Sequence, residues 1–255
     1  MRGIRRFFLF LVTSLLVVFG PAEAENTAEP TIPSRLAPSF IEFFDTLALT
    51  ADFGPFNRRP AWVRKWNGPV TITLSEPAEK LRDDIERLTR RVSQWTGLPF
   101  SVATPGTRPI ADGSNIINIR LIPQADTGEA FASGDIVCQT ETHGMGGALH
   151  TGYMVISERY IDCLTHEFMH VLGFDSHWRP TGRANIRSVL ALRDTEMRTS
   201  DFSSWDILAI RLLYNQRIHA GMPRGRSLVI ANEVIRRGPQ RAALPSASGF
   251  RQTNW

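Results

Sequence analysis

Two histidines four residues apart, His166 and His170, constrain the fold of this 255-residue chain more than any other feature. Side chains four residues apart lie on one face of an α-helix, so both imidazoles can bind one metal ion only where the segment is helical. We therefore predict a helix over Arg159–Leu172 that presents the two histidines together. A His-Glu-x-x-His pattern also arises by chance in about one chain in a hundred of this size, so its context matters.

Glu167, next to the first histidine, completes a pattern typical of catalytic zinc sites. Zinc binds histidine nitrogen at about 2.0–2.1 Å, and a catalytic site keeps three protein ligands and an open position for water. The zinc lowers the pKa of that water from about 15.7 toward about 7, and a neighbouring carboxylate accepts its proton as it attacks a polarised carbonyl. We predict one catalytic Zn²⁺ bound by His166 and His170, with Glu167 as the general base.

A third zinc ligand is expected after Gly173, where a left-handed glycine can end the helix and let the chain double back. His177 is our first choice, because an imidazole suits a site that already has two. Asp175 is an alternative, although its short side chain follows the turn very closely. A residue from elsewhere in the chain is the other alternative: Cys163, His143 or His150. The plainest interpretation is that His177 is an ordinary loop residue.

The N-terminal 24 residues are typical of an export signal. A basic start precedes an apolar run over Phe7–Phe19, and Ala22–Ala24 provides a small-x-small cleavage site. The run is too short to span a bilayer comfortably, and no cysteine follows it to carry a lipid. We predict that residues 1–24 are removed and that the mature protein is secreted or periplasmic, with no stable membrane anchor.

The charge of the mature chain argues against nucleic acid as a partner. Loss of three arginines and one glutamate with the signal lowers the formal net charge from +4 to +2. The remaining basic residues are scattered, apart from those between Arg236 and Arg241, and no aromatic residues interleave with them. We expect a peptide or protein substrate instead.

Two cysteines, Cys138 and Cys163, remain in the exported chain. An oxidising compartment makes a disulfide between them the expected state. The closed loop of about 25 residues would stabilise the fold by about 3 kcal/mol in the chain-entropy model. The alternative is that Cys163 binds the metal, because it precedes His166 and His170 on the same predicted helical face.

Composition divides the chain into four parts. After the signal, residues 25–38 form a flexible leader rich in Pro, Ala, Thr and Glu, and residues 39–222 form the domain. Residues 223–255 form a basic tail rich in Pro, Gly and Ala, apart from a short helix around residues 228–235.

Hydrophobic periodicity predicts an α+β fold for the domain. Apolar residues at helical spacing predict a helix around residues 40–47 and a longer one from Pro77 to Gly97. Ser203 and Asp206 form a capping box at the start of a C-terminal helix. Runs rich in β-branched residues predict strands at 70–74, 100–103, 116–121 and 153–157. This order gives a mixed sheet with helices packed on it.

The motif region resembles the metzincins, whose pattern is His-Glu-x-x-His-x-x-Gly-x-x-His/Asp followed by a Met-turn. The matching residues are His166, Glu167, His170 and Gly173. The metzincin position of the third ligand falls on Ser176, while His177 stands one residue later and Asp175 one earlier. Met197 stands where a Met-turn could be, and Ser203–Tyr214 resembles the C-terminal helix of matrixin-like catalytic domains.

A closer likeness is to the bacterial domain of unknown function 2927, over about residues 39–222. It rests on Arg64–Val70, Trp95–Leu98, the Cys163–Leu164 start of the motif helix and Ala209–Met222. The likeness implies a zincin, metzincin-like fold: a mixed twisted sheet, a zinc-binding active-site helix and a C-terminal helix. Many members carry Glu or Gln where zinc ligands are expected, so the intact motif of this chain is what favours activity.

The leading hypothesis is an exported zinc metallopeptidase in which Glu167 activates water against a peptide bond. An extended peptide could add to the sheet edge at residues 152–157. Two alternatives stay open: a catalytically inactive zincin-like binding or structural protein, and a zinc amidase acting on cell-wall material. The glycine-rich segment 144–147 lacks a following helix with phosphate-loop spacing, so we assign it no nucleotide role.

Overall fold

The computed structural model describes residues 36–50, 62–104, 115–123, 138–179, 186–192 and 198–237. The predicted signal, residues 25–35 of the leader, Met197 and residues 238–255 of the tail lie outside these ranges. Within them the chain has an α+β fold with a mostly parallel sheet. Across the same ranges, every helix is too short or too polar to cross a membrane.

The described residues contain a six-stranded sheet with the order β1-β6-β4-β2-β3, and β5 pairs with the other edge of β6. All neighbouring pairs are parallel except β5 and β6, which form an antiparallel hairpin. The bounds are β1 Lys65–Trp66, β2 Val70–Leu74, β3 Phe100–Val102, β4 Asn115–Ile122, β5 Cys138–Met145 and β6 Ala148–Ser157. The sheet is therefore mixed, as the sequence predicts.

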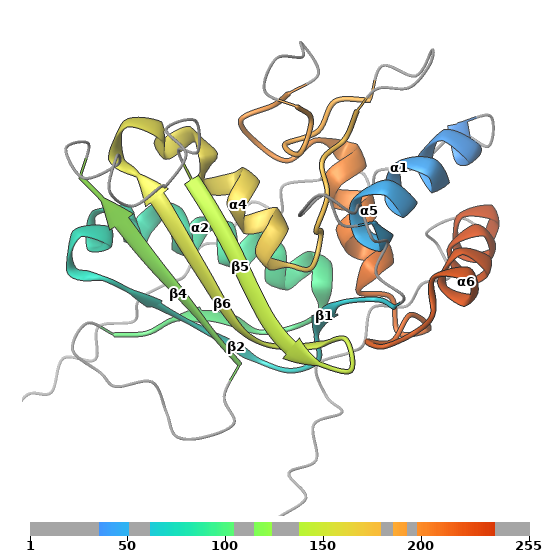
Figure 1. Ribbon diagram of the computed structural model, residues 1–255, viewed down its shortest axis with the longest axis horizontal. Helices are drawn as coiled ribbons and strands as arrows, with labels where there is room; N and C mark the ends of the chain where they lie inside the picture. The colour runs from blue at the N-terminus through green and yellow to red at the C-terminus, as the bar shows by residue number, and fades with distance from the viewer. Residues whose placement is uncertain are drawn as a thin grey trace, which may run out of the picture.

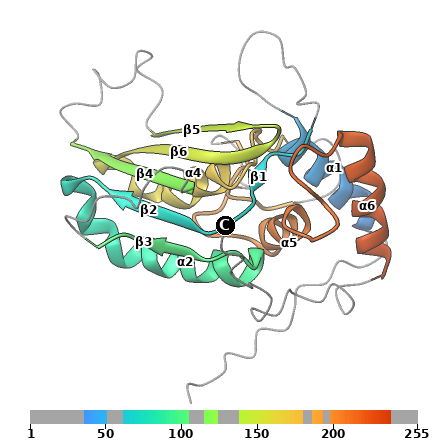
Figure 2. The ribbon, with the colours of Figure 1, turned by 90° about the horizontal axis from the view of Figure 1, so that it is seen from below.

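The α-helices of the described part lie in two groups (Figure 1). Their bounds are α1 Ala37–Leu49, α2 Arg82–Thr96, α4 Leu164–Val171, α5 Ser204–Leu213 and α6 Arg224–Arg237. Helices α2 and α4 lie on one face of the sheet, and α1, α5 and α6 gather beside one end of it (Figure 2). On the opposite face, strand residues such as Glu141, His143 and Tyr153 are exposed to solvent.

The longest predicted helix is confirmed as α2. Ile85, Leu88 and Val92 are buried on one side of it, and Gly97, with a φ of 71°, ends it in the left-handed conformation. Its first predicted turns form a separate 3-10 helix, Glu76–Leu81. The helix predicted around residues 40–47 is also confirmed, as α1, which begins inside the segment interpreted as a leader.

Strand β5 is not predicted by the sequence analysis. Its outward side chains are polar and its other side chains are only half-buried after Cys138, so no apolar alternation marks the strand. The strand depends on its pairing with β6 through a two-residue turn. Gly146 and Gly147 form this turn with φ values of 59° and 86°, which is the backbone that a tight hairpin favours.

The peptide-binding edge predicted at residues 152–157 is wrong. β6 pairs with β4 on one side and with β5 on the other, so its backbone groups are already used. The open edge is that of β5, which pairs only with β6 in the described part of the chain. This edge lies next to α4, because the Thr140 hydroxyl of β5 donates to the backbone oxygen of Glu167 at 3.1 Å.

The motif helix is shorter than predicted. Residues Glu158–Cys163 form a 3-10 helix in which Tyr160 has non-helical angles, φ −127° and ψ 46°, and α4 begins only at Leu164. The predicted disulfide is confirmed: Cys163 is bonded to Cys138, which joins the start of β5 to the N-terminus of α4. The alternative that Cys163 is a metal ligand is therefore wrong.

Helix α6 lies in the segment interpreted as a tail and is longer than the short helix predicted there. Ile230 and Ala231 are buried, and Arg224 forms an ion pair with Asp45 of α1. Residues up to Arg237 thus belong to the packed structure.

Candidate metal centre

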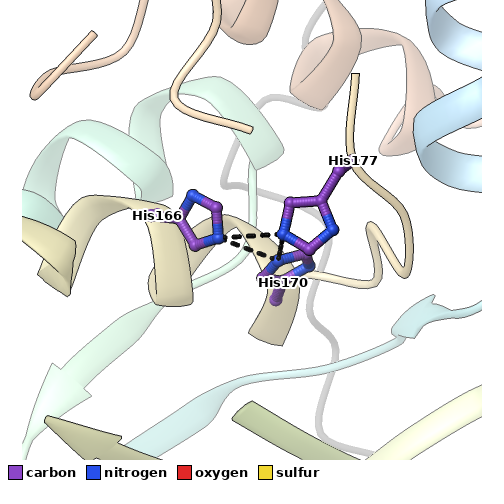
Figure 3. Close-up of side chains that lie close together, drawn as sticks. All are labelled: His166, His170 and His177. Atoms are coloured by element: carbon purple, nitrogen blue, oxygen red, sulfur yellow. Dashed lines mark hydrogen bonds between the residues drawn. The ribbon is translucent and has the colours of Figure 1, made fainter. Parts of the chain in front are cut away.

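Three histidines converge beside α4 (Figure 3). His166 and His170 project from the helix, and His177 comes from the loop that follows it. Their Nε2 atoms form a triangle with sides of 3.2 Å, 3.2 Å and 3.3 Å. The structure therefore brings together the three residues that the sequence predicts as ligands.

The partners of the second ring nitrogens show which nitrogen of each ring faces the centre. Nδ1 of His166 lies 2.7 Å from the carbonyl oxygen of Val189, and Nδ1 of His170 lies 2.6 Å from that of Phe174. A carbonyl only accepts, so both Nδ1 atoms carry the proton and both Nε2 atoms present a lone pair. Two lone pairs 3.2 Å apart cannot form a hydrogen bond with each other. A cation between them removes the repulsion.

The dimensions of the triangle fit a zinc ion. Ligand atoms about 2.0–2.1 Å from a tetrahedral zinc ion are about 3.3–3.4 Å from one another. The observed separations of 3.2–3.3 Å are close to these values. Imidazole also binds copper, iron and nickel, so the donor set indicates a metal site without identifying the metal.

Burial keeps the ligands in the state that a metal needs. It lowers the pKa of His166 to about 3, with the neighbouring His177 acting in the same direction. Burial also lowers the pKa of His170 well below its usual value. Since metal ions bind the neutral imidazole, these histidines need not release a proton to bind one at neutral pH.

Gly173 turns the chain sharply from α4 toward His177. Its φ is 107°, and a Cβ atom there would lie 2.2 Å from the carbonyl oxygen of Arg64. Both the backbone conformation and the close contact therefore require glycine. The loop after it places His177 one residue beyond the metzincin position, yet its Nε2 atom still reaches the triangle.

The alternative third ligands lie elsewhere. Asp175 accepts a hydrogen bond of 2.7 Å from Arg64, and His143 and His150 are exposed on β5 and β6. Among the described residues, the three histidines are the group that could hold a metal ion.

Glu167 is buried on α4, directly after the first ligand, with 6% of its surface exposed. Burial raises the pKa of its carboxyl to about 7, while Thr140 and the positive charge of Arg198 act in the opposite direction. A carboxyl with a pKa near neutrality can both accept and release a proton under working conditions.

Val189 and Asp206 position His166, although the sequence analysis assigns neither to the site. The carbonyl of Val189 accepts from Nδ1 of His166, and the backbone N–H of Val189 donates to the Asp206 carboxylate at 3.1 Å. The predicted capping box of Ser203 and Asp206 is confirmed. Asp206 also holds the turn next to His166, by accepting from the N–H of Val189. No local sequence pattern predicts this contact, because Val189 stands 17 residues earlier.

Two side chains hold the C-terminal end of α4. The indole Nε1 of Trp66 donates to the carbonyl of Val171 at 2.8 Å, and the hydroxyl of Tyr214 donates to that of Leu172 at 2.9 Å. These bonds satisfy carbonyls that a helix end leaves without an intrahelical partner. They fix the end of the helix next to His170.

The fold and the site together define an α+β protein with a three-histidine centre that could hold a metal ion. The sequence matches no protein-family model, and a search of curated proteins finds no match. The relation to the metzincins and to domain of unknown function 2927 stays a prediction.

Proposed function

We propose that this protein is an exported zinc-dependent metallopeptidase of the zincin type. The proposal is carried by one observation: three Nε2 atoms converge at α4, and the residue that follows His166 on this helix is a buried glutamate. Three neutral imidazoles with one open position are the donor set of hydrolytic zinc sites. A carboxylate next to a ligand supplies the base that such a site requires.

The residues have distinct tasks in this reaction. When bound, zinc would supply a Lewis acid that polarises a carbonyl and lowers the pKa of a water molecule. Glu167 accepts the proton of the water on its carboxylate and donates it to the leaving nitrogen of the peptide. Hydrogen bonds to the carbonyls of Val189 and Phe174 keep His166 and His170 from rotating while this happens.

The open edge of β5 supports a peptide as the substrate class. An edge strand presents free backbone N–H and C=O groups, and an extended peptide can pair with them. Because Thr140 of β5 contacts Glu167, a peptide on this edge passes close to the proposed base. A peptide bound in this way pairs with β5, the strand beside the proposed metal centre, and not with β6.

Two further observations support the proposal. The disulfide between Cys138 and Cys163 is compatible with an oxidising compartment and hence with export. The mixed sheet, the histidine-bearing helix and the capped helix α5 are elements that the zincin resemblance implies.

A comparison of the parent protein with Glu167→Gln tests this function. The parent is expected to contain about one zinc ion per chain and to cleave an unfolded protein, with loss of activity in a chelator and recovery with zinc. Glu167→Gln should keep the zinc and lose turnover by about 10²–10⁴-fold, the usual contribution of a general base. Glu233→Gln, on the exposed side of α6, is the control and should behave as the parent.

Either of two results would contradict the proposal. Unchanged turnover in Glu167→Gln removes the residue from the mechanism. A parent protein that holds zinc but cleaves no peptide favours a binding protein or a zinc amidase with another substrate.

A further inference from the structure

Arg64 contacts both the loop that carries His177 and strand β5, and the proposed reaction needs these two parts in a fixed relative position. It directly precedes β1, and its Nη1 atom donates to the Asp175 carboxylate at 2.7 Å. Its Nη2 atom donates to the backbone oxygen of Thr142 at 2.8 Å and to the hydroxyl of the same residue at 2.7 Å. Thr142 belongs to β5, and Asp175 stands two residues before His177. One side chain therefore connects the open edge strand to the loop of the third histidine.

These contacts are of a kind that fixes geometry. The side chains of Arg64 and Asp175 are 25% and 8% exposed, so solvent screens this ion pair less than a surface pair. The planar guanidinium holds its two partner residues at a set angle, whereas the single ammonium of a lysine cannot reproduce that fork. The pair therefore sets a position as well as contributing stability.

The backbone around Arg64 reinforces the same link. The carbonyl of Arg64 lies against Gly173, the residue that turns the chain toward His177. The carbonyl of Val63 lies against Gly147 of the β5–β6 turn, and the N–H of Lys65 donates to the carbonyl of Gly147 at 3.0 Å. Three successive residues thus touch both the turn after α4 and the hairpin turn.

We propose that Arg64 is a positioning residue that holds His177 in the metal centre through Asp175 and fixes the open edge of β5 relative to that centre through Thr142. The first half depends only on the three-histidine centre. The second half rests on the proposed peptidase function. If the ion pair merely stabilised the fold, its removal would lower the free energy of unfolding and leave the metal centre unchanged.

The rate of zinc release tests the link through Asp175. With an excess of chromogenic chelator, Arg64→Ala and Asp175→Asn should each release zinc about 10-fold faster than the parent, at the lower end of the effect of residues that orient ligands. The double variant should release it no faster than either single variant, because both changes break one link. In cobalt-substituted protein, the visible absorption of Co²⁺ should shift in the same variants.

Arg224→Ala is the matched control. It removes another partly buried Arg–Asp pair, between α6 and Asp45 of α1. This variant should lower the stability of the fold and leave zinc release and the cobalt spectrum unchanged.

Two further measurements keep the test informative where Arg64→Ala folds poorly. Arg64→Lys keeps the charge and one contact, so its zinc release should be intermediate. Arg64 and Asp175 line a cavity of about 300 Å³, which gives a guanidinium ion access to the space that Arg64→Ala leaves. Guanidinium far below denaturing concentrations should slow zinc release in Arg64→Ala and not in the double variant.

The outcomes separate this inference from the proposed function. If the parent holds zinc and both Arg64 variants release it at the parent rate with an unchanged cobalt spectrum, the role of Arg64 is wrong whatever the protein hydrolyses. If zinc release changes and the parent cleaves no peptide, the link to His177 stands and the peptidase function fails. In an active parent, Arg64→Ala should raise KM more than Asp175→Asn does, because only the former frees Thr142.

Discussion

Asp206→Asn tests whether the metal centre depends on a carboxylate far from it in sequence. Asp206 is fully buried and accepts hydrogen bonds of 2.6–3.1 Å from Ser188, Val189 and Ser203. Removing one partner from a buried charged network costs about 3–5 kcal/mol. Asparagine keeps the shape and one acceptor oxygen, so we expect the free energy of unfolding to fall by about 2 kcal/mol. A domain with about 5–15 kcal/mol of stability still folds after such a loss.

The same substitution should weaken zinc binding. In either orientation the NH₂ group of asparagine replaces an oxygen that accepts from Ser188 or from Val189. This disturbs the turn that carries the Val189 carbonyl, the acceptor of His166. We expect zinc affinity to fall by about 10-fold, as for other residues that orient a ligand. Urea unfolding of the zinc-free protein and competition with a chelator measure the two effects. Asp201→Asn, at an exposed ion pair, is the control. Parent-like stability and affinity in Asp206→Asn would refute the reasoning.

Two predictions concern residues that the sequence already singles out. His177→Ala should weaken zinc binding more than Asp175→Ala does. Asp175→Ala should lower zinc affinity by no more than about 10–100-fold, the usual effect of a residue that orients a ligand without binding the metal. A competition titration that ranks them the other way makes Asp175 the ligand. The unfolded, unreduced protein should show no free thiol, and replacing Cys138 and Cys163 by serine should cost about 3–4 kcal/mol in urea unfolding for a separation of 25 residues. Two titratable thiols would contradict the disulfide.

The histidine cluster is predictable because the sequence information for it is local. His166 and His170 stand one helical turn apart, Gly173 marks where the helix must end, and His177 follows within the next few residues. Helical periodicity and the conformational freedom of glycine are properties of short segments, so a pattern in the sequence is enough. Helix α2 is predictable for the same reason.

β5 depends instead on a distant partner, and the start of the motif segment departs from an α-helix. β5 has exposed polar side chains such as Gln139 and Glu141, and only its ladder to β6 makes it a strand. The available signal was Gly146-Gly147, since two glycines between extended runs are typical of a hairpin. For residues 158–163 the composition does not exclude an α-helix, and the departure lies in the backbone of Tyr160.

Arg64 and the two residues of β1 make long-range contacts that support the fold and do not depend on the metal. Successive side chains of an extended chain point in opposite directions. Arg64 and Trp66 therefore reach the loop after α4 and the end of α4, while Lys65 donates to one carbonyl at the end of α5 and one beyond it. These three residues also open the segment Arg64–Val70, on which the likeness to domain of unknown function 2927 partly rests. None of them is a zinc ligand. A protein that had lost its zinc ligands would still need these contacts to hold the motif helix, its loop and the C-terminal helix together. The likeness therefore implies the fold more strongly than the reaction, and the proposed activity rests on the histidine triangle and Glu167.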